Sequence, residues 1–230
     1  MEFKSALIVG AGPGLSASLA RQLANLGTKV ALAARNPGKL ASLCRETGAT
    51  AFACDATDPG AVITLFTDVD AAHGAPDLVV YNASARAPGP ITEIAAADVR
   101  RALAISAFGG FLVGQQAAIR MVARSSGVIL FTGASASVKG YRQSAAFAMG
   151  KFALRGLAQS MARELAPQGV HVAHVVIDGG IRSEKRPVPA DRPDSLLDPD
   201  AIAAAYLQLA QQDRSAWTWE LELRPWVETF

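Results

Sequence analysis

Short apolar runs alternate along the chain with longer segments in which apolar residues recur every three or four positions. The first run covers residues 6–9 and stops at a glycine cluster, after which leucines from Leu15 to Leu26 are spaced as on one helix face, up to Gly27. A short apolar run predicts a buried strand, and a period near 3.6 predicts a helix. The chain is therefore expected to open with a strand, a tight turn and a helix.

The alternation continues along the chain. Further strands are expected at residues 30–34, 51–54, 78–81, 128–131, 170–177 and 217–223. Further helices are expected from Asn36-Pro37 to Gly48, from Asp58-Pro59 through Val69, at about 97–122 and 147–165, and from Asp198-Pro199 to Ala210, each residue pair supplying an N-cap and a first turn. Repeated units of this length predict a Rossmann-type α/β fold, a doubly wound parallel sheet with helices on both faces.

One such domain fits the length of the chain. We expect residues 1–230 to form a single domain of this type. Residues 183–197 interrupt the pattern with three prolines and several charges. Long irregular segments of compact domains commonly carry function, so this stretch is predicted to be a mobile flap that covers the site and selects the substrate.

Composition narrows the class of protein. Apolar residues make up 50% and charged residues 18%, which favours a doubly covered sheet or a buried subunit interface. The net charge of +2 is spread without a basic cluster, which argues against nucleic acid as a partner. The first apolar run is too short for a signal peptide or membrane span, so we expect a cytoplasmic location and no membrane partner.

The chain has two cysteines, Cys44 and Cys54, without a C-x-x-C pair or a histidine cluster beside them. Such spacing suggests neither a disulfide framework nor a zinc site. Both are expected to be reduced core thiols, and no metal site is predicted.

A glycine-rich loop, Gly10-Ala11-Gly12-Pro13-Gly14-Leu15-Ser16, lies between the first strand and the first helix. At such a turn the backbone amides and the helix dipole can hold a pyrophosphate. The residues assigned to this role are Gly10, Gly12, Gly14 and Leu15. The spacing is glycine, three residues, glycine, one residue, and then Ser16 in place of a last glycine. The alternative is a glycine turn that merely connects strand and helix.

The residues after the second strand indicate which dinucleotide is bound. An acidic residue there would bind the adenosine ribose hydroxyls of NAD, but this chain has Ala34-Arg35. A guanidinium suits the additional 2′-phosphate of NADP, so NADP is favoured over NAD. The alternative is that Arg35 is a solvated loop residue.

Two residue pairs that each begin with a polar residue follow the third and fourth predicted strands. Asp55-Ala56 follows the third strand and Asn82-Ala83 follows the fourth, at the sheet edge where ligands bind in such folds. Asp55 is compatible with accepting from an adenine amino group and equally with a turn role.

Phe147-Ala148-Met149-Gly150-Lys151 carries the candidate redox chemistry. Residues four apart share one face of a helix. If that face borders a cofactor, Lys151 can donate to ribose hydroxyls, whereas Phe147 has no hydroxyl with which to pass a proton. The alternative for Lys151 is a surface lysine.

These segments in this order resemble the classical-type short-chain dehydrogenase/reductase family, from residue 6 to about 210. The supporting segments are Gly10 to Ser16, Asp55-Ala56, Asn82-Ala83-Ser84, and Phe147 to Lys151 with the residues that follow. The resemblance implies a tetrad of asparagine, serine, tyrosine and lysine. In that family the tyrosine is the proton donor or acceptor, the lysine lowers its pKa and holds the ribose, and the serine polarises the substrate oxygen.

Carried over by position, the resemblance puts Phe147 at the tyrosine, Lys151 at the lysine, Ala134 at the serine and Ser106 at the asparagine. Only the lysine is retained. The chain is therefore similar to an atypical subgroup in which phenylalanine replaces the active-site tyrosine. The family also implies a homodimer or homotetramer through two apolar helices, although these helices could equally just cover the sheet.

Three nearby hydroxyls are candidates to replace the missing acid. Ser135 and Ser137 flank the vacated serine position, and serines in such loops commonly bond to local backbone instead. Tyr141 is the nearby phenol, with an aromatic lid as its alternative role.

The resulting hypothesis is an NADP(H)-dependent oxidoreductase with altered proton delivery, acting on a small carbonyl, imine or activated alkene. Losing the general acid removes roughly 10²–10⁴-fold of rate, whereas hydride transfer needs mainly position and orientation. The alternative is a non-catalytic NADP(H)-binding sensor or regulatory protein, favoured by the three tetrad losses.

Overall fold

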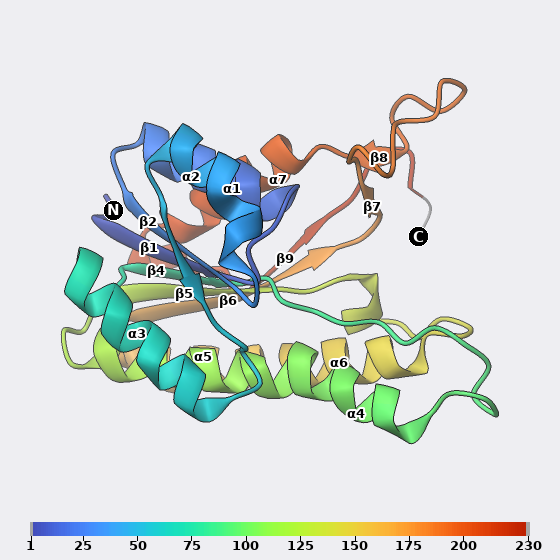
Figure 1. The fold of residues 1–230 in the computed structure, drawn as a ribbon, viewed down its shortest axis with the longest axis horizontal. Coiled ribbons are helices and arrows are strands. Elements are labelled where there is room, and N and C mark those ends of the chain that lie inside the picture. The colour runs from blue at the N-terminus through green and yellow to red at the C-terminus, as the bar shows by residue number, and fades with distance from the viewer. Residues whose placement is uncertain (1, 229–230) are drawn as a thin grey trace.

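In the computed structural model, which describes residues 2–228, one parallel sheet lies between two layers of helices (Figure 1). Its strands are β1 (Ser5–Val9), β2 (Lys29–Ala34), β3 (Thr50–Ala53), β4 (Leu78–Tyr81), β5 (Gly127–Thr132), β6 (Val170–Ile177) and β9 (Glu220–Leu223). They are hydrogen-bonded in the order β3-β2-β1-β4-β5-β6-β9, with every neighbouring pair parallel. The predicted doubly wound α/β fold is confirmed.

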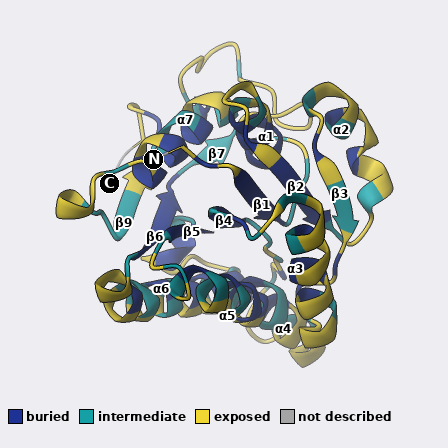
Figure 2. Cartoon of the chain, turned by 90° about the vertical axis from the view of Figure 1, so that its left-hand side faces the viewer, coloured by how far each residue is buried: buried dark blue, intermediate teal, exposed yellow. Residues whose placement is uncertain are grey.

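The helices divide between the two faces of the sheet, as Figures 1 and 2 show. One layer contains α1 (Leu15–Asn25), α2 (Ala41–Thr47) and α7 (Pro199–Ala210). The other contains α3 (Pro59–His73), α4 (Ala96–Leu103), α5 (Gly109–Val122) and α6 (Ala145–Leu165). Both faces of the sheet are therefore covered, and its carboxyl edge remains for binding.

The central strands are largely apolar because successive side chains enter different cores. In β1, Ala6 and Ile8 pack in the core beneath α1 and α7, whereas Leu7 and Val9 pack in the core above α3 and α5. All five β1 residues are buried, and Figure 2 shows the central strands in the buried colour. Because both faces of the sheet are covered, the positions on both faces of β1 are apolar from Ala6 to Val9.

The predicted N-caps hold the starts of their helices. The side chains of Asp58 and Asp198 each accept hydrogen bonds from backbone N–H groups in the first turn of α3 and α7. Asn36 does the same for a single 3₁₀ turn, Pro37–Leu40, and α2 begins only after that turn. The prolines at the first positions lose no helical hydrogen bond there.

The helical segment predicted at about 97–122 contains a feature that its apolar pattern did not indicate. A π turn, Ala104–Phe108, joins α4 to α5. The hydroxyl of buried Tyr81, at the end of β4, donates to the carbonyl of Ile105 within this turn. The π turn thus places the Ile105 carbonyl where Tyr81, which is distant in the sequence, can donate to it. Turns of this kind recur at functional sites.

The same segment, Ala96–Val122, is long and apolar enough to cross a membrane by length and composition alone. In the structure α5 packs along α3, α6, β4 and β5, and 44% of the most apolar window is buried. Core helices of globular domains meet the same criteria, so the length and composition of this helix are not evidence that it crosses a membrane.

Two short strands frame the segment predicted to be a flap. β7 (Gly180–Ile181) and β8 (Leu196–Leu197) pair in parallel, and Arg182 and Asp198 form an ion pair of 2.7 Å beside them. Strands of two residues carry no periodicity, so they were not predicted. The intervening residues project beyond the sheet edge in Figure 1 and are largely exposed. Their mobility stays a prediction.

Candidate functional site

The carboxyl ends of the strands form two adjoining cavities. One has a volume of about 590 Å³ and lies over the ends of β1, β2 and β3, and the other has about 630 Å³ and lies over β5 and β6. They share the lining residues Asn82, Ser84 and Arg86, which follow β4. Together they form a trough at the switch point of the sheet. This point lies between β1 and β4, because the strands after β1 are added on one side of it and the strands after β4 on the other.

The glycine loop forms one wall of the first cavity. Gly10 has φ +85°, and a Cβ there would overlap the backbone of Ala83. Gly12, by contrast, has nothing within 4 Å of the place its Cβ would occupy, and it lines the cavity. Gly10 is thus needed for the close approach of the loop to β4, whereas Gly12 leaves open space at the binding surface.

The serine that departs from the glycine pattern has a structural contact. The side-chain amide of Asn82 donates to the Ser16 hydroxyl at 2.8 Å, and that hydroxyl donates to the carbonyl of Gly10 at 3.4 Å. Among the described residues, those lining the cavity include neither Gly14 nor Leu15, and the Leu15 side chain lies in the core. These two residues can therefore contribute only through the backbone at the start of α1.

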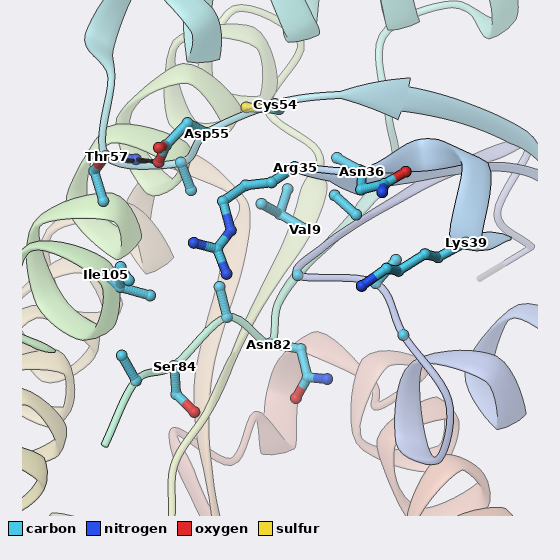
Figure 3. A pocket seen from close by; sticks show the side chains of 18 of the residues that line it. Val9, Arg35, Asn36, Lys39, Cys54, Asp55, Thr57, Asn82, Ser84 and Ile105 are labelled. Carbon is cyan, nitrogen blue, oxygen red and sulfur yellow. Dashed lines mark hydrogen bonds between the residues drawn. The ribbon is translucent and has the colours of Figure 1, made fainter. Parts of the chain in front are cut away.

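Two exposed cations reach into the first cavity from the end of β2 and the turn after it. Figure 3 shows Arg35 and Lys39 extending into this space, with Asn36 between them in the chain. Lys39 was not predicted, although its position four residues after Arg35, on a turn at the same sheet edge, was a usable signal. Within residues 2–228, neither side chain forms an ion pair of 4 Å or less.

Asp55 follows β3 and acts as a turn residue, which is one of the two roles considered for it. Its Oδ1 accepts from the N–H of Thr57 at 2.9 Å and from the Thr57 hydroxyl at 2.8 Å. These two hydrogen bonds lower the pKa of Asp55, with a smaller effect from Arg35. The carboxylate also lines the cavity beside Ala56 (Figure 3), so its contact with an adenine stays a prediction.

The second cavity brings most of the predicted catalytic positions together. Its lining includes Ala134, Ser135, Tyr141, Ser144, Phe147, Lys151, Asp178, Arg186 and Glu228. They come from the segment after β5, from α6, from the turn after β6, from the segment between β7 and β8 and, for Glu228, from the segment after β9. The sequence spacing from Ala134 to Lys151 therefore corresponds to a spatial cluster.

Lys151 is buried at the base of this cavity, so its alternative as a surface lysine is wrong. Its side chain is 2% exposed, and Nζ donates to the carbonyl of Thr132 at 2.6 Å. The Thr132 hydroxyl accepts from buried Tyr206 at 2.9 Å, which ties the strand end to α7. Burial, and then repulsion from Arg86, lower the pKa of Lys151 to about 7.

Phe147 lies near two cations. The guanidinium carbon of Arg86 is 4.4 Å from the centre of the ring, and the Lys151 ammonium is 5.9 Å from it. The ring is 8% exposed and faces the cavity. Cations over an aromatic face are attracted by its quadrupole, so the phenylalanine ring favours positive charge beside it.

Two of the candidate serines are committed to the backbone. Ser106 is fully buried in the π turn, its hydroxyl accepts from the N–H of Ala85 at 3.2 Å, and it lines neither cavity. Ser137 is also fully buried, and its hydroxyl accepts from the N–H of Ala134 at 3.1 Å. Both serines therefore position loops beside the trough.

Five of the described residues that line the second cavity carry a hydroxyl group. Ser135 and Tyr141 line it as predicted, and Ser84, Thr132 and Ser144, which were not predicted as proton donors, line it as well. Ser144 is the N-cap of α6, three residues before Phe147, and Tyr141 is about half exposed. These side chains, together with water, are the groups available to supply protons there.

A half-buried network holds α6 behind the site. Arg155, one turn after Lys151, donates two hydrogen bonds of 2.6 and 2.7 Å to Glu220 of β9, and Glu220 accepts from Nδ1 of His174 at 3.0 Å. Burial lowers the pKa of His174 to about 4, so its ring is neutral. Its Nε2 has no partner among residues 2–228, and a Cβ at Gly133 would overlap it. The helix that carries Lys151 is thus fixed to the sheet.

Comparisons with known proteins agree with this arrangement. The sequence profile of the short chain dehydrogenase family matches residues 4–186. The cyclic-di-GMP-binding biofilm dispersal mediator protein of Escherichia coli (strain K12) is 33% identical over 198 residues, 84% of this chain and 79% of that protein.

Solved structures give the same picture. A short-chain dehydrogenase from Rhodopseudomonas palustris is 36% identical with a TM-score of 0.84, covering 96% of this chain and 98% of its own. A metagenomic short-chain oxidoreductase in complex with NADP is 30% identical with a TM-score of 0.85, covering 96% and 97%. Both likenesses extend over nearly the whole chain, the segments around both cavities included.

Two alanine substitutions in the glycine loop are expected to separate folding from the binding surface. Gly10→Ala should cost at least about 2 kcal/mol of unfolding free energy, because it combines a strained φ with overlap against Ala83. Gly12→Ala should stay within about 0.5 kcal/mol of the parent, because its methyl group points into open space. Urea denaturation measures both, and equal losses in the two variants would contradict the loop geometry.

Lys151→Met is expected to raise the unfolding free energy at pH 7 by about 1–3 kcal/mol, because Met has a similar length and no charge to bury. The gain should be largest below pH 7 and should fade toward pH 10.5, since in that interval the unfolded chain keeps a proton that the native lysine has lost. Denaturation of both proteins at neutral and alkaline pH tests this. A variant less stable than the parent throughout would show that the Thr132 contact outweighs the burial cost.

Proposed function

The chain belongs to the short-chain dehydrogenase family, and from that premise we propose that it is an NADP(H)-dependent oxidoreductase with altered proton delivery, acting on a small carbonyl, imine or activated alkene. Members of this family are oxidoreductases that bind nicotinamide cofactors. One observation carries the proposal for this chain. The two cavities share three lining residues and so make one trough, with the glycine loop at one end and Lys151 at the other.

The residues around the first cavity fit a dinucleotide with a 2′-phosphate. Open space at Gly12 leaves the loop accessible to a pyrophosphate. Arg35 and Lys39 offer two cations without ion-pair partners in the described part of the chain, and residue 35 is not the acid that would bind the ribose hydroxyls of NAD. NADP in the metagenomic relative supports the same preference.

In the second cavity, Lys151 is the residue that we expect to hold the nicotinamide ribose. The bound nucleotide supplies or accepts a hydride, and this chemistry belongs to the cofactor. The chain's own contribution is to orient the reactants, exclude water on the Phe147 side and supply a proton from Ser135, Tyr141, Ser144 or solvent. We assign the chain to the atypical subgroup with phenylalanine at the tyrosine position.

This site favours particular substrates. Without a phenol, a developing alkoxide receives no direct proton from residue 147, and general acid catalysis of roughly 10²–10⁴-fold is absent. An iminium carbon needs no proton at the moment of hydride transfer, and an activated alkene can be protonated by water. These classes therefore suit the site better than a simple ketone.

We also propose a homodimer or homotetramer, with residues 183–197 as a flap and a cytoplasmic location. Exposed apolar side chains occur on α5 and α6 and on the π turn before α5, namely Phe108, Phe111, Ile119, Met149 and Phe152. Contact with a second copy would cover them. On the flap side, Arg186 lines the second cavity, which supports a role in selecting the substrate.

A non-catalytic nucleotide sensor is the second candidate. It is favoured by the absence of the tyrosine and serine at residues 147 and 134, and by the E. coli relative whose name records cyclic-di-GMP binding. Turnover by the unmodified chain that Lys151→Ala abolishes would exclude the sensor.

NADPH is expected to bind at least tenfold more tightly than NADH, because the 2′-phosphate gains charge-assisted hydrogen bonds to Arg35 and Lys39. The double variant Arg35→Gln/Lys39→Gln should bring the two affinities to within about threefold and leave NADH binding unchanged. Fluorescence titration measures all four affinities, with Arg45→Gln, an exposed arginine outside both cavities, as the control. Equal affinities in the parent would exclude the NADP preference, and absence of binding would remove the proposed function.

Phe147→Tyr is expected to create or raise ketone reduction by roughly 10²-fold, because the new phenol would lie on the helix face beside Lys151. Steady-state assays with NADPH and a panel of ketones, imines and enones measure the gain. Lys151→Ala in the same background should remove it. If neither Phe147→Tyr nor Phe147→Tyr/Ala134→Ser gains activity, the pocket is not a carbonyl-reducing site.

A further inference from the structure

Two arginines face the second cavity from different segments of the chain. Arg86 follows β4 and Arg186 belongs to the segment between β7 and β8, and both are exposed and line the cavity. In the part of the chain that the structure describes, neither guanidinium is within 4 Å of a carboxylate. Both guanidinium groups therefore bring to the cavity a positive charge that no carboxylate of the described residues pairs with.

Arg86 makes a cation–π contact. Its guanidinium carbon lies 4.4 Å from the centre of the Phe147 ring, and among the described residues its N–H groups donate no hydrogen bond. A guanidinium held in this way presents a planar fork of donors that matches a carboxylate or a phosphate. The ring at position 147 is therefore a platform for an anion-binding arginine.

Arg186 is placed by a glycine. A Cβ at Gly180 would lie 2.8 Å from Nη1 of Arg186 and 2.8 Å from a methyl carbon of Leu196. The missing side chain thus leaves room for the guanidinium against β7, at the mouth of the cavity. This position joins the charge to the segment that we propose as the flap.

The carboxylates of the same cavity do not cancel this charge. Asp178 is 5% exposed and lies 3.4 Å from the Lys139 ammonium and 4.0 Å from the Arg224 guanidinium, so its charge is already compensated. Glu228 is exposed at the rim. Against it stand Arg86, Arg186 and Lys151, which leaves the cavity positive.

We propose that the second cavity selects substrates that carry an anionic group, a carboxylate or a phosphate, which Arg86 binds from its platform on Phe147 and Arg186 binds from the flap. The inference rests on the proposed function, since it takes this cavity as the substrate half of the trough. The substrate class is then a small anionic carbonyl, imine or enone. Arg86 also lines the first cavity, so a role toward the dinucleotide is the competing assignment that a test must separate.

The test compares matched probes on the NADPH-saturated protein by isothermal titration calorimetry. The probes are 4-oxopentanoate with its methyl ester, and 2-oxopropylphosphonate with its dimethyl ester, so that charge changes while the ketone is kept. In the parent, each anion is expected to bind at least tenfold more tightly than its ester, and the stronger of the two anions identifies the preferred group. The preference should shrink as ionic strength rises.

Substitutions test which residues cause the tighter binding of each anion over its ester. Arg86→Gln should reduce it to about threefold or less, Arg86→Lys should keep part of it, and Arg186→Gln should lower it to a smaller extent. Glu228→Gln should strengthen it. Arg45→Gln, which removes the same charge outside both cavities, should leave it unchanged. Circular dichroism confirms that each variant is folded.

NADPH affinity is measured first, which keeps the two proposals apart. If NADPH does not bind, the proposed function fails. If NADPH binds and the esters match the anions, or no probe binds, the anion proposal is overturned while the oxidoreductase proposal stands. It is also overturned if Arg86→Gln weakens NADPH and leaves the preference for anions intact, since Arg86 then serves the dinucleotide.

Discussion

The buried ammonium of Lys151 is the interaction on which the site depends. Its hydrogen bond to the Thr132 carbonyl joins α6 to the end of β5, and Tyr206 bonds to the same threonine from the opposite helix layer. One turn along α6, Arg155 fixes the helix to β9 through Glu220. A buried cation is costly, so a helix anchored on both sides of it is what allows the lysine to remain at the base of the trough.

Phenylalanine at position 147 changes what this cation can do. A phenol beside an ammonium has its charged form stabilised, which is the basis of acid catalysis in the family, whereas a benzyl ring offers only its face. Here Arg86 lies over the ring and the Lys151 ammonium lies near it. If Phe147 stands at the family's tyrosine position, as we propose, the substitution exchanges a proton donor for a ring that attracts cations.

The fold was predictable because each of its signals is local. Apolar runs located the central strands, and Asp58 and Asp198 located two helix starts. The proximity of Phe147 and Lys151 was predictable for the same reason, since residues four positions apart lie on the same face of a helix. Arg86 escaped prediction because its contact with Phe147 joins distant parts of the chain. The π turn and the short strands β7 and β8 carry no period that a sequence pattern could reveal.

Charge is where sequence and structure differ most. A net charge of +2 without a basic cluster argued only against nucleic acid as a partner. In the folded chain many cations are neutralised locally, among them Arg21 by Glu46, Arg120 by Asp70 and Arg155 by Glu220. The cations that line the trough without an ion-pair partner in the described residues are Arg35, Lys39, Arg86, Lys151 and Arg186. These five cations lie along one sheet edge, where we propose that they attract a phosphorylated nucleotide and an anionic substrate together.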